Sequence, residues 1–180
     1  IDPLFIVAPW VFLFLIPAVT MKMFAEEQKS GTIEILLTQP LTDLQIVLAK
    51  YFSAVLLVII ALVPTLVYYI TVYMLANPAG NIDTAGIIGS YIGLVFLCSG
   101  FASIGVFASA LSNNQIVSFI LAVILSFFFY SGFEFLGSII TQPTISNLLA
   151  QLGISSHYGS MSRGVIDSRD VIYFISLTLF

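Results

Sequence analysis

Residues 84–133 read TAGIIGSYIGLVFLCSGFASIGVFASALSNNQIVSFILAVILSFFFYSGF, and this stretch contains no Asp, Glu, Lys or Arg. Residues 51–82 also lack these four charged types. A charge-free apolar run of about 20 residues is long enough to cross a bilayer as a helix. The whole chain is 59% hydrophobic and 8% charged, whereas a soluble domain has about 25% charged residues. The sequence therefore predicts an all-α integral membrane protein, a polytopic bundle of transmembrane helices.

The hydrophobic stretches define a single transmembrane domain over residues 1–180. Its predicted membrane segments are 4–21, 46–76, 85–111, 116–140 and 171–180. Pro64 predicts a kink within the second segment, because proline cannot donate the helical hydrogen bond. The cluster Asn77-Pro78-Ala79-Gly80-Asn81 is typical of a turn. Segments two and three should therefore form a hairpin.

Two helix starts carry the sequence signature of a capping box, in which two side chains satisfy free backbone N–H groups. The first is Thr42-Asp43-Leu44-Gln45, just before the second segment. The second is Ser112-Asn113-Asn114-Gln115, just before the fourth. We expect each motif to cap the helix that follows it.

The third segment is rich in small residues, which let helix backbones approach closely in lipid. Two interpretations remain open from sequence alone: close packing within the chain, or an interface with a second subunit. The residues are Gly86, Gly89, Ser90, Gly93, Gly100, Ser103, Gly105 and Ser109.

Two polar regions, 22–45 and 141–170, separate the membrane segments and should face opposite sides. The side that holds residues 22–50 carries three lysines and is predicted to be cytoplasmic, by a small excess over Arg163 and Arg169 on the other side. The outer region 141–170 should contain an amphipathic helix ended by Gly153. Its apolar residues at helical spacing are Ile145, Leu148, Leu149 and Leu152.

Several function classes are disfavoured by composition. The net charge of −4 argues against nucleic acid as a partner, because phosphate binding requires clustered Lys and Arg. A lone buried cysteine, Cys98, and a lone histidine, His157, offer no metal site. We interpret His157 as a surface or structural residue. An intramembrane enzyme is disfavoured as well, because no Ser–His or paired-Asp arrangement is visible within the apolar segments.

Residues 26–41, EEQKSGTIEILLTQPL, stand out among the polar residues. Gly31 can bend the chain before a short helix that Pro40 ends. Ile33, Leu36 and Leu37 fall on one face of that helix. Such a stripe between two membrane spans can rest on lipid headgroups as an ordinary amphipathic loop, or it can contact a partner protein.

The pattern Glu27-x-x-x-Gly31-Thr32-x-Glu34-x-Leu36-Leu37-x-x-Pro40, followed by Lys50, resembles the signature of ABC-2 type transporter permeases. The segment order around it is similar too. Residues 17–50 and 163–167 are similar to the permease of the bacterial gliding-motility transporter. In that family about six spans are expected, so the first would be missing from this fragment.

The resemblance implies a transport function without ATP hydrolysis on this chain, which has no GxxxxGK[ST] phosphate loop. It implies a separate ABC ATP-binding subunit that carries ATP and Mg, a second permease copy or paralogue, surrounding lipid, and a multi-pass location in the bacterial inner membrane. Export of a substrate is the expected activity, and an anchor for a surface machine is the alternative. The ATPase-coupling residues implied are Glu27, Gly31, Thr32, Ile33, Glu34, Leu36, Leu37 and Pro40.

Glu134 lies late in the fourth segment, and an ionisable group within a membrane is a functional candidate. It can be solvated near the headgroups, pair with Arg163 or Arg169, or line a cargo path. Tyr68, Tyr69 and Tyr73 are interpreted as an interfacial aromatic belt.

Overall fold

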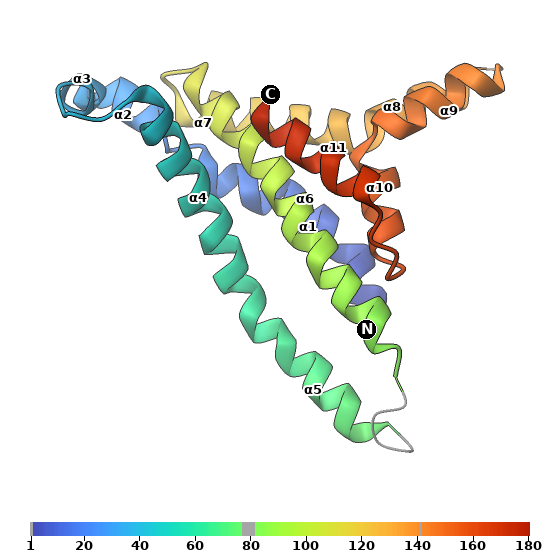
Figure 1. The fold of residues 1–180 in the computed structure, drawn as a ribbon. Coiled ribbons are helices and arrows are strands. Elements are labelled where there is room, and N and C mark those ends of the chain that lie inside the picture. The colour runs from blue at the N-terminus through green and yellow to red at the C-terminus, as the bar shows by residue number, and fades with distance from the viewer. Residues whose placement is uncertain (1, 77–81, 141) are drawn as a thin grey trace.

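The computed structural model describes residues 2–76, 82–140 and 142–180; the predicted turn at 77–81 lies outside them (Figure 1). The described residues form helices and connecting segments, with no β-strand among them, as the composition predicts. The helices are α1 (Asp2–Thr20), α2 (Ala25–Ser30), α3 (Thr32–Leu37), α4 (Asp43–Leu62), α5 (Leu66–Leu75), α6 (Thr84–Ala110), α7 (Gln115–Phe127), α8 (Phe133–Ile139), α9 (Pro143–Leu152), α10 (Ile154–Met161) and α11 (Ser168–Leu179).

Four helical stretches in the described part are long and apolar enough to cross a membrane: Pro3–Ser30, Asp43–Leu75, Thr84–Ala110 and Gln115–Ile139. The third of these, α6, is the most buried and forms the centre of the bundle. Helices α1, α4, α7, α10 and α11 all pack against it. The polytopic helix bundle predicted from sequence is thus confirmed.

The small residues of α6 pack against other helices of the same chain. A Cβ added at Gly89 would lie 2.7 Å from the Cα of Gly164. One added at Gly93 would lie 3.0 Å from the Cβ of Met161, and one at Gly105 would overlap Thr20. These glycines therefore serve packing within the chain, the first of the two interpretations.

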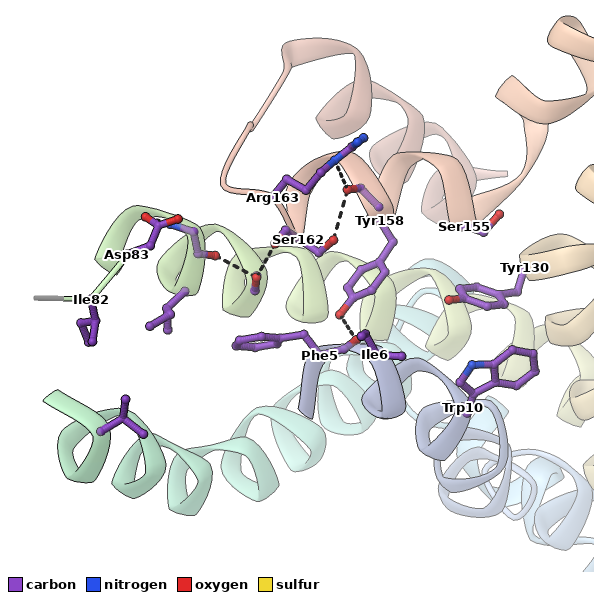
Figure 2. Close-up of a pocket in the computed structure, with 15 residues that line it drawn as sticks. Phe5, Ile6, Trp10, Ile82, Asp83, Tyr130, Ser155, Tyr158, Ser162 and Arg163 are labelled. Atoms are coloured by element: carbon purple, nitrogen blue, oxygen red, sulfur yellow. Dashed lines mark hydrogen bonds between the residues drawn. The ribbon is translucent and has the colours of Figure 1, made fainter. Parts of the chain in front are cut away.

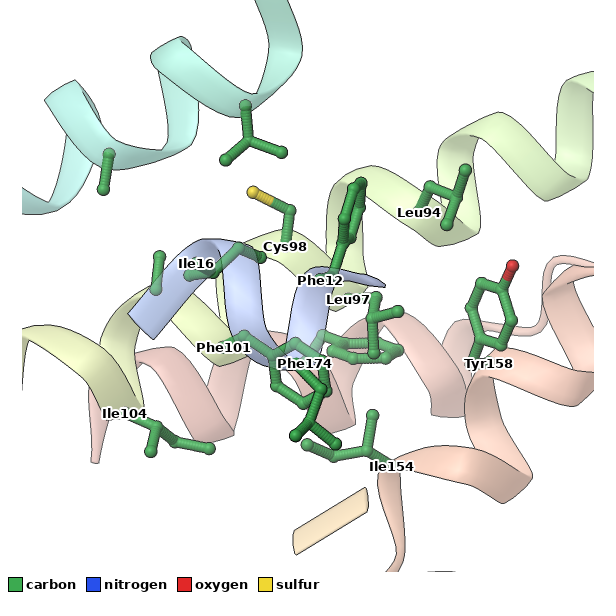
Figure 3. Close-up of a cluster of buried hydrophobic side chains, with 14 of the residues drawn as sticks. Phe12, Ile16, Leu94, Leu97, Cys98, Phe101, Ile104, Ile154, Tyr158 and Phe174 are labelled. Atoms are coloured by element: carbon green, nitrogen blue, oxygen red, sulfur yellow. The ribbon is translucent and has the colours of Figure 1, made fainter. Parts of the chain in front are cut away.

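The apolar core lies where α1 and α6 meet α10 and α11 (Figure 3). Phe101 and Leu97 of α6 are fully buried there, as is Phe174 of α11. From α10, Ile154 and Tyr158 join the same cluster. Part of the region predicted to be polar therefore packs into the core of the bundle. This corrects the interpretation of residues 154–161 as a polar segment.

The second and fourth membrane segments are both irregular. In the second, a 3₁₀ turn over Val63–Thr65 separates α4 from α5, at the kink predicted for Pro64. In the fourth, a π-helical turn over Phe128–Gly132 separates α7 from α8. No proline marks this π turn, and Gly132 at its end is the one breaker that it contains; the turn was not predicted.

The two predicted capping boxes differ in outcome. Thr42 caps α4, accepting from the Gln45 backbone N–H while Gln45 Oε1 accepts from the Thr42 N–H, so that box is confirmed. The box at Ser112 is wrong. Asn114 is the cap of α7 and accepts from the Ile116 N–H at 2.9 Å. The Ser112 hydroxyl instead accepts from the Asn114 N–H and shapes the turn before the cap.

The predicted amphipathic helix is present as α9, and Gly153 follows its last residue. The two polar regions lie at opposite ends of the bundle. At one end, the turn after α1 contacts Ser109 near the end of α6. At the other end, Gly164 contacts Gly86 at the start of α6. Which end faces the cytoplasm stays a prediction.

Candidate coupling site

Gly31 joins α2 to α3 in a left-handed backbone conformation, with φ of 72°. Its N–H donates to the Gln28 carbonyl at the end of α2. A Cβ at this position would meet no atom within 4 Å. Glycine is therefore favoured here by the backbone conformation and not by lack of space, because a residue with a Cβ is strained in the left-handed conformation.

A serine near the end of α6 fixes the turn between α1 and α2. The Ser109 hydroxyl accepts from the backbone N–H groups of Phe24 and Ala25 at 2.9 and 3.2 Å. The same hydroxyl donates to the Met21 carbonyl at 3.1 Å. Gln28 adds a bond from its side-chain amide to the Ala110 carbonyl. This end of α2 is thus bonded directly to the central helix.

Lys50 connects α2 to α4. Its ammonium donates to Glu27 Oε1 and to the Met23 carbonyl, each at 2.5 Å, and lies 4.7 Å from the centre of the Phe24 ring. The two side chains of the ion pair are 16% and 32% exposed for Lys50 and Glu27, respectively. The Glu27 carboxylate is therefore directed toward α4 and is engaged within the chain.

The short helix α3 presents different side chains inward and outward. Ile33 and Leu36 pack against a small cluster formed by Phe24, Ile46 and Val106. Ile35, in contrast, is 64% exposed. The Leu37 side chain lies outside the described part of the structure.

Leu41 and Leu44, which follow α3, are exposed as well. Leu41 lies in the segment between α3 and α4, and Leu44 lies in the first turn of α4. We call Ile35, Leu41 and Leu44 the exposed α3–α4 residues. These exposed residues were not predicted as contacts, because Ile33, Leu36 and Leu37 form the more obvious apolar stripe. Ile35 is a single apolar residue on its side of α3, and Leu41 and Leu44 lie beyond the helix, so the three do not form a pattern at helical spacing.

The remaining motif residues have mainly local roles in the structure. Thr32 begins α3, and its hydroxyl lies 2.8 Å from that of Ser30. Glu34 is exposed in the first turn. The helix ends at Leu37, before the exposed Pro40. Among the described residues, no group of three His, Cys, Asp or Glu side chains could hold a metal ion.

Glu134 lies at the other end of the bundle. It is exposed, and its Oε2 accepts a bond from the Ser155 hydroxyl at 3.0 Å. No ion pair links it to Arg163 or Arg169 among the described residues. The pairing with arginine considered from sequence is therefore wrong, and a hydrogen bond to α10 takes its place.

Ser155 also lines a cavity of about 760 Å³ between α1, α6 and α10 (Figure 2). At one end of this cavity, the Tyr130 ring from the π turn lies edge-on to Trp10, with centres 5.8 Å apart. The Tyr158 hydroxyl donates to the Phe5 carbonyl at 2.7 Å and so joins α10 to α1. Arg163 lines the same cavity. The cavity combines aromatic surface with a polar rim.

Asp167 caps α11 beyond this cavity. The backbone N–H of Arg169 donates to Asp167 Oδ1 at 3.2 Å, and this bond holds the pKa of Asp167 below its ordinary value. The Ser168 hydroxyl, 3.2 Å from the same oxygen, acts in the same direction. The carboxylate is thus favoured in its ionised form as a helix cap.

The chain is similar over residues 2–161 to a family described as ABC-2 family transporter protein. It matches no curated protein and no solved structure.

Proposed function

The chain belongs to the ABC-2 family of transporter proteins and is a membrane component of an ABC transporter; from this premise we propose that α2 and α3 form the segment through which a separate ATPase subunit drives export. The family implies an ATPase partner, and ATP with Mg would bind there. The polar connections of α2 carry the proposal: Glu27 to Lys50 on α4, and the turn before α2 to Ser109 on α6.

A partner that pushed on α2 and α3 would transmit force to two membrane helices. Ion-paired and hydrogen-bonded contacts resist separation more than an apolar contact of the same size, because a buried partner left unpaired costs about 1–3 kcal/mol. A displacement of α2 would therefore move α4 and α6 rather than break these bonds. The ATPase can drive such a change only by binding two states of the permease with different affinity.

The exposed α3–α4 residues supply the apolar surface for this contact. Ile35, Leu41 and Leu44 are exposed apolar side chains, and the exposed Glu34 directly precedes Ile35 in the chain. Ile33 and Leu36, named as contacts from sequence, support α3 from the inner side. In this assignment Glu27 acts by holding α2 on α4, and Gly31 by setting the angle between α2 and α3.

Substituting Ile35→Asp tests the proposal, because a charge would disrupt an apolar contact without disturbing the core. The variant should insert normally and lose co-purification with the ATPase subunit. Ile166→Asp, at another exposed isoleucine near the opposite end of the bundle, is the matched control and should retain the subunit. If Ile35→Asp still co-purified with the ATPase subunit at the native level, the proposed contact at Ile35 would be wrong.

The proposal extends to the branch of the family and the location in the cell. The similarity of residues 17–50 and 163–167 to gliding-motility permeases supports a place in that branch. In such a transporter the chain would lie in the bacterial inner membrane, in contact with lipid and with a second permease copy or paralogue. A membrane anchor that uses the same fold without transport is the competing function. ATP hydrolysis by the partner separates the two: a transporter's ATPase should respond to cargo, and an anchor's should not.

A further inference from the structure

His157, the only histidine in the chain, joins three helices. From α10, its Nδ1 lies 2.6 Å from Asp170 Oδ1 on α11. Its Nε2 lies 2.8 Å from the carbonyl oxygen of Gln151 on α9. The side chain of His157 is 14% exposed. Both ring nitrogens therefore face oxygen atoms of the protein in a largely enclosed position, which favours the structural one of the two roles considered for His157.

The hydrogen bonds fix the number of protons in this cluster. A carbonyl oxygen only accepts, so Nε2 must carry a hydrogen. An ionised Asp170 also only accepts, so Nδ1 must then carry a second hydrogen; if Asp170 is protonated instead, its O–H donates to Nδ1. In both arrangements the pair holds one proton more than a neutral imidazole beside an ionised carboxylate.

Burial strengthens the requirement for this proton. Asp170 is only 6% exposed. Its second oxygen, Oδ2, is buried and has no hydrogen-bond partner among the described residues. A carboxylate in such a position is costly unless a positive charge compensates it or a proton neutralises it. Without the extra proton, Asp170 would face a lone pair of His157.

The Tyr173 ring favours a cationic His157. The two rings are stacked with centres 4.0 Å apart and planes 19° apart, and an aromatic face attracts a cation. The Tyr173 hydroxyl donates to the Leu152 carbonyl, so it does not compete for the histidine. Tyr173 thereby fixes the ring in the plane that reaches both oxygens.

Three of the elements that pack on α10, namely α6, α9 and the π turn, bring no competing charge. Within α6, α9 and the π turn the titratable groups are Tyr91, Cys98 and Tyr130, all uncharged at neutral pH. Four charged groups near this site are exposed: Asp83 caps α6, Glu134 bonds to Ser155 two residues before His157, and Asp167 and Arg169 precede Asp170 in the first turn of α11.

We propose that His157 and Asp170 form a proton-binding site that fastens α10 to α9 and α11. Loss of the proton would leave two acceptors facing each other and would loosen this junction. Helix α10 also lines the cavity near Tyr130 through Ser155, Tyr158 and Gly159, so the proton would control how firmly one wall of that cavity is held. This inference does not depend on the ATPase partner.

The lone histidine allows a direct test on the purified full chain in lipid nanodiscs. With ¹⁵N-labelled histidine, both ring nitrogens should show the signal of a protonated or proton-sharing nitrogen at neutral pH. A singly protonated ring with no shared proton would overturn the proposal.

Stability provides the second test. One proton bound only by the folded state changes the folded-to-unfolded ratio by up to about tenfold per pH unit. The melting midpoint should thus fall by roughly 3–5 °C per unit as pH rises above the range where the histidine of the unfolded chain loses its proton, as long as the folded site keeps its own. His157→Gln should remove this dependence.

The matched variant is Asp170→Asn, whose amide can donate to a neutral Nδ1 and so keep both bonds without the extra proton. It should be independent of neutral pH and more stable than the native chain at high pH. If it retained the native pH dependence, or if His157→Gln did, the site would not bind the proton.

Discussion

The ammonium of Lys50 lies 2.5 Å from Oε1 of Glu27, and this contact bridges 23 positions of sequence to join α4 to α2. The same ammonium also bonds to the Met23 carbonyl. One side chain therefore holds both the turn after the first span and the helix that follows it. The pair lies next to the turn fastened by Ser109, so the two attachments of α2 act together.

Replacing Lys50 with Met should destabilise the chain by about 1–3 kcal/mol, because Glu27 keeps a partly buried charge without a partner. Adding Glu27→Gln should recover part of the loss, since that change removes the stranded charge. Melting curves in nanodiscs measure both effects. Lys29→Met, at an exposed lysine of α2, is the control and should have little effect. Strictly additive losses for Lys50→Met and Glu27→Gln would show that the pair is not coupled.

Gly105→Ala should destabilise the bundle by about 1–3 kcal/mol, because the new methyl group would overlap Thr20 of α1. Thr20→Ala in the same chain should restore part of the stability by removing the hydroxyl that overlaps. Gly159→Ala is the control, since a Cβ there would meet no atom within 4 Å. Folding yield and melting midpoint report the difference. Equal behaviour of the two alanine variants would mean that α1 and α6 are not in close contact at Gly105.

Asp167 should make the chain lose stability in acid. Its pKa is lowered in the folded state by the Arg169 N–H, so its contribution is present above the ordinary Asp value of about 3.9 and is lost as pH falls below it. Asp167→Asn should remove this acid dependence while keeping the helix cap. The dependence has the opposite sign to the one proposed for His157 and lies in a separate pH range, so a single pH series of melting curves resolves both.

The long helices were predictable because each contains a long apolar stretch without charged residues. A run such as residues 84–133 is too long and too apolar to fold as part of a soluble domain, and its ends are marked by Asp83 and Glu134. The cap at Thr42 was predictable because its partner, Gln45, is local. Asn114 was missed because Ser112 offered an equally good pattern two residues earlier, and only the backbone conformation decides between them.

Helix α10 was missed although its sequence contains a signal. Ile154, Tyr158 and Met161 recur at helical spacing and form its buried face, but serines and His157 between them made the region look external. The candidate site was only partly predictable for a related reason. The motif located α2 and α3, whereas the pairing of Glu27 with Lys50 and the outward position of Ile35 depend on how α3 packs.

The close contacts of α6 restrict how this chain can diverge. At Gly89, Gly93 and Gly105 a single added carbon would meet a neighbouring helix, so we expect these positions to resist substitution in any homologue that keeps the arrangement. The outward side chains of α4 and α5, such as Leu57 and Val67, are exposed and are not confined in this way by a neighbouring helix. Variation should therefore accumulate on that surface, where one apolar side chain can replace another, while the middle of the bundle stays nearly unchanged.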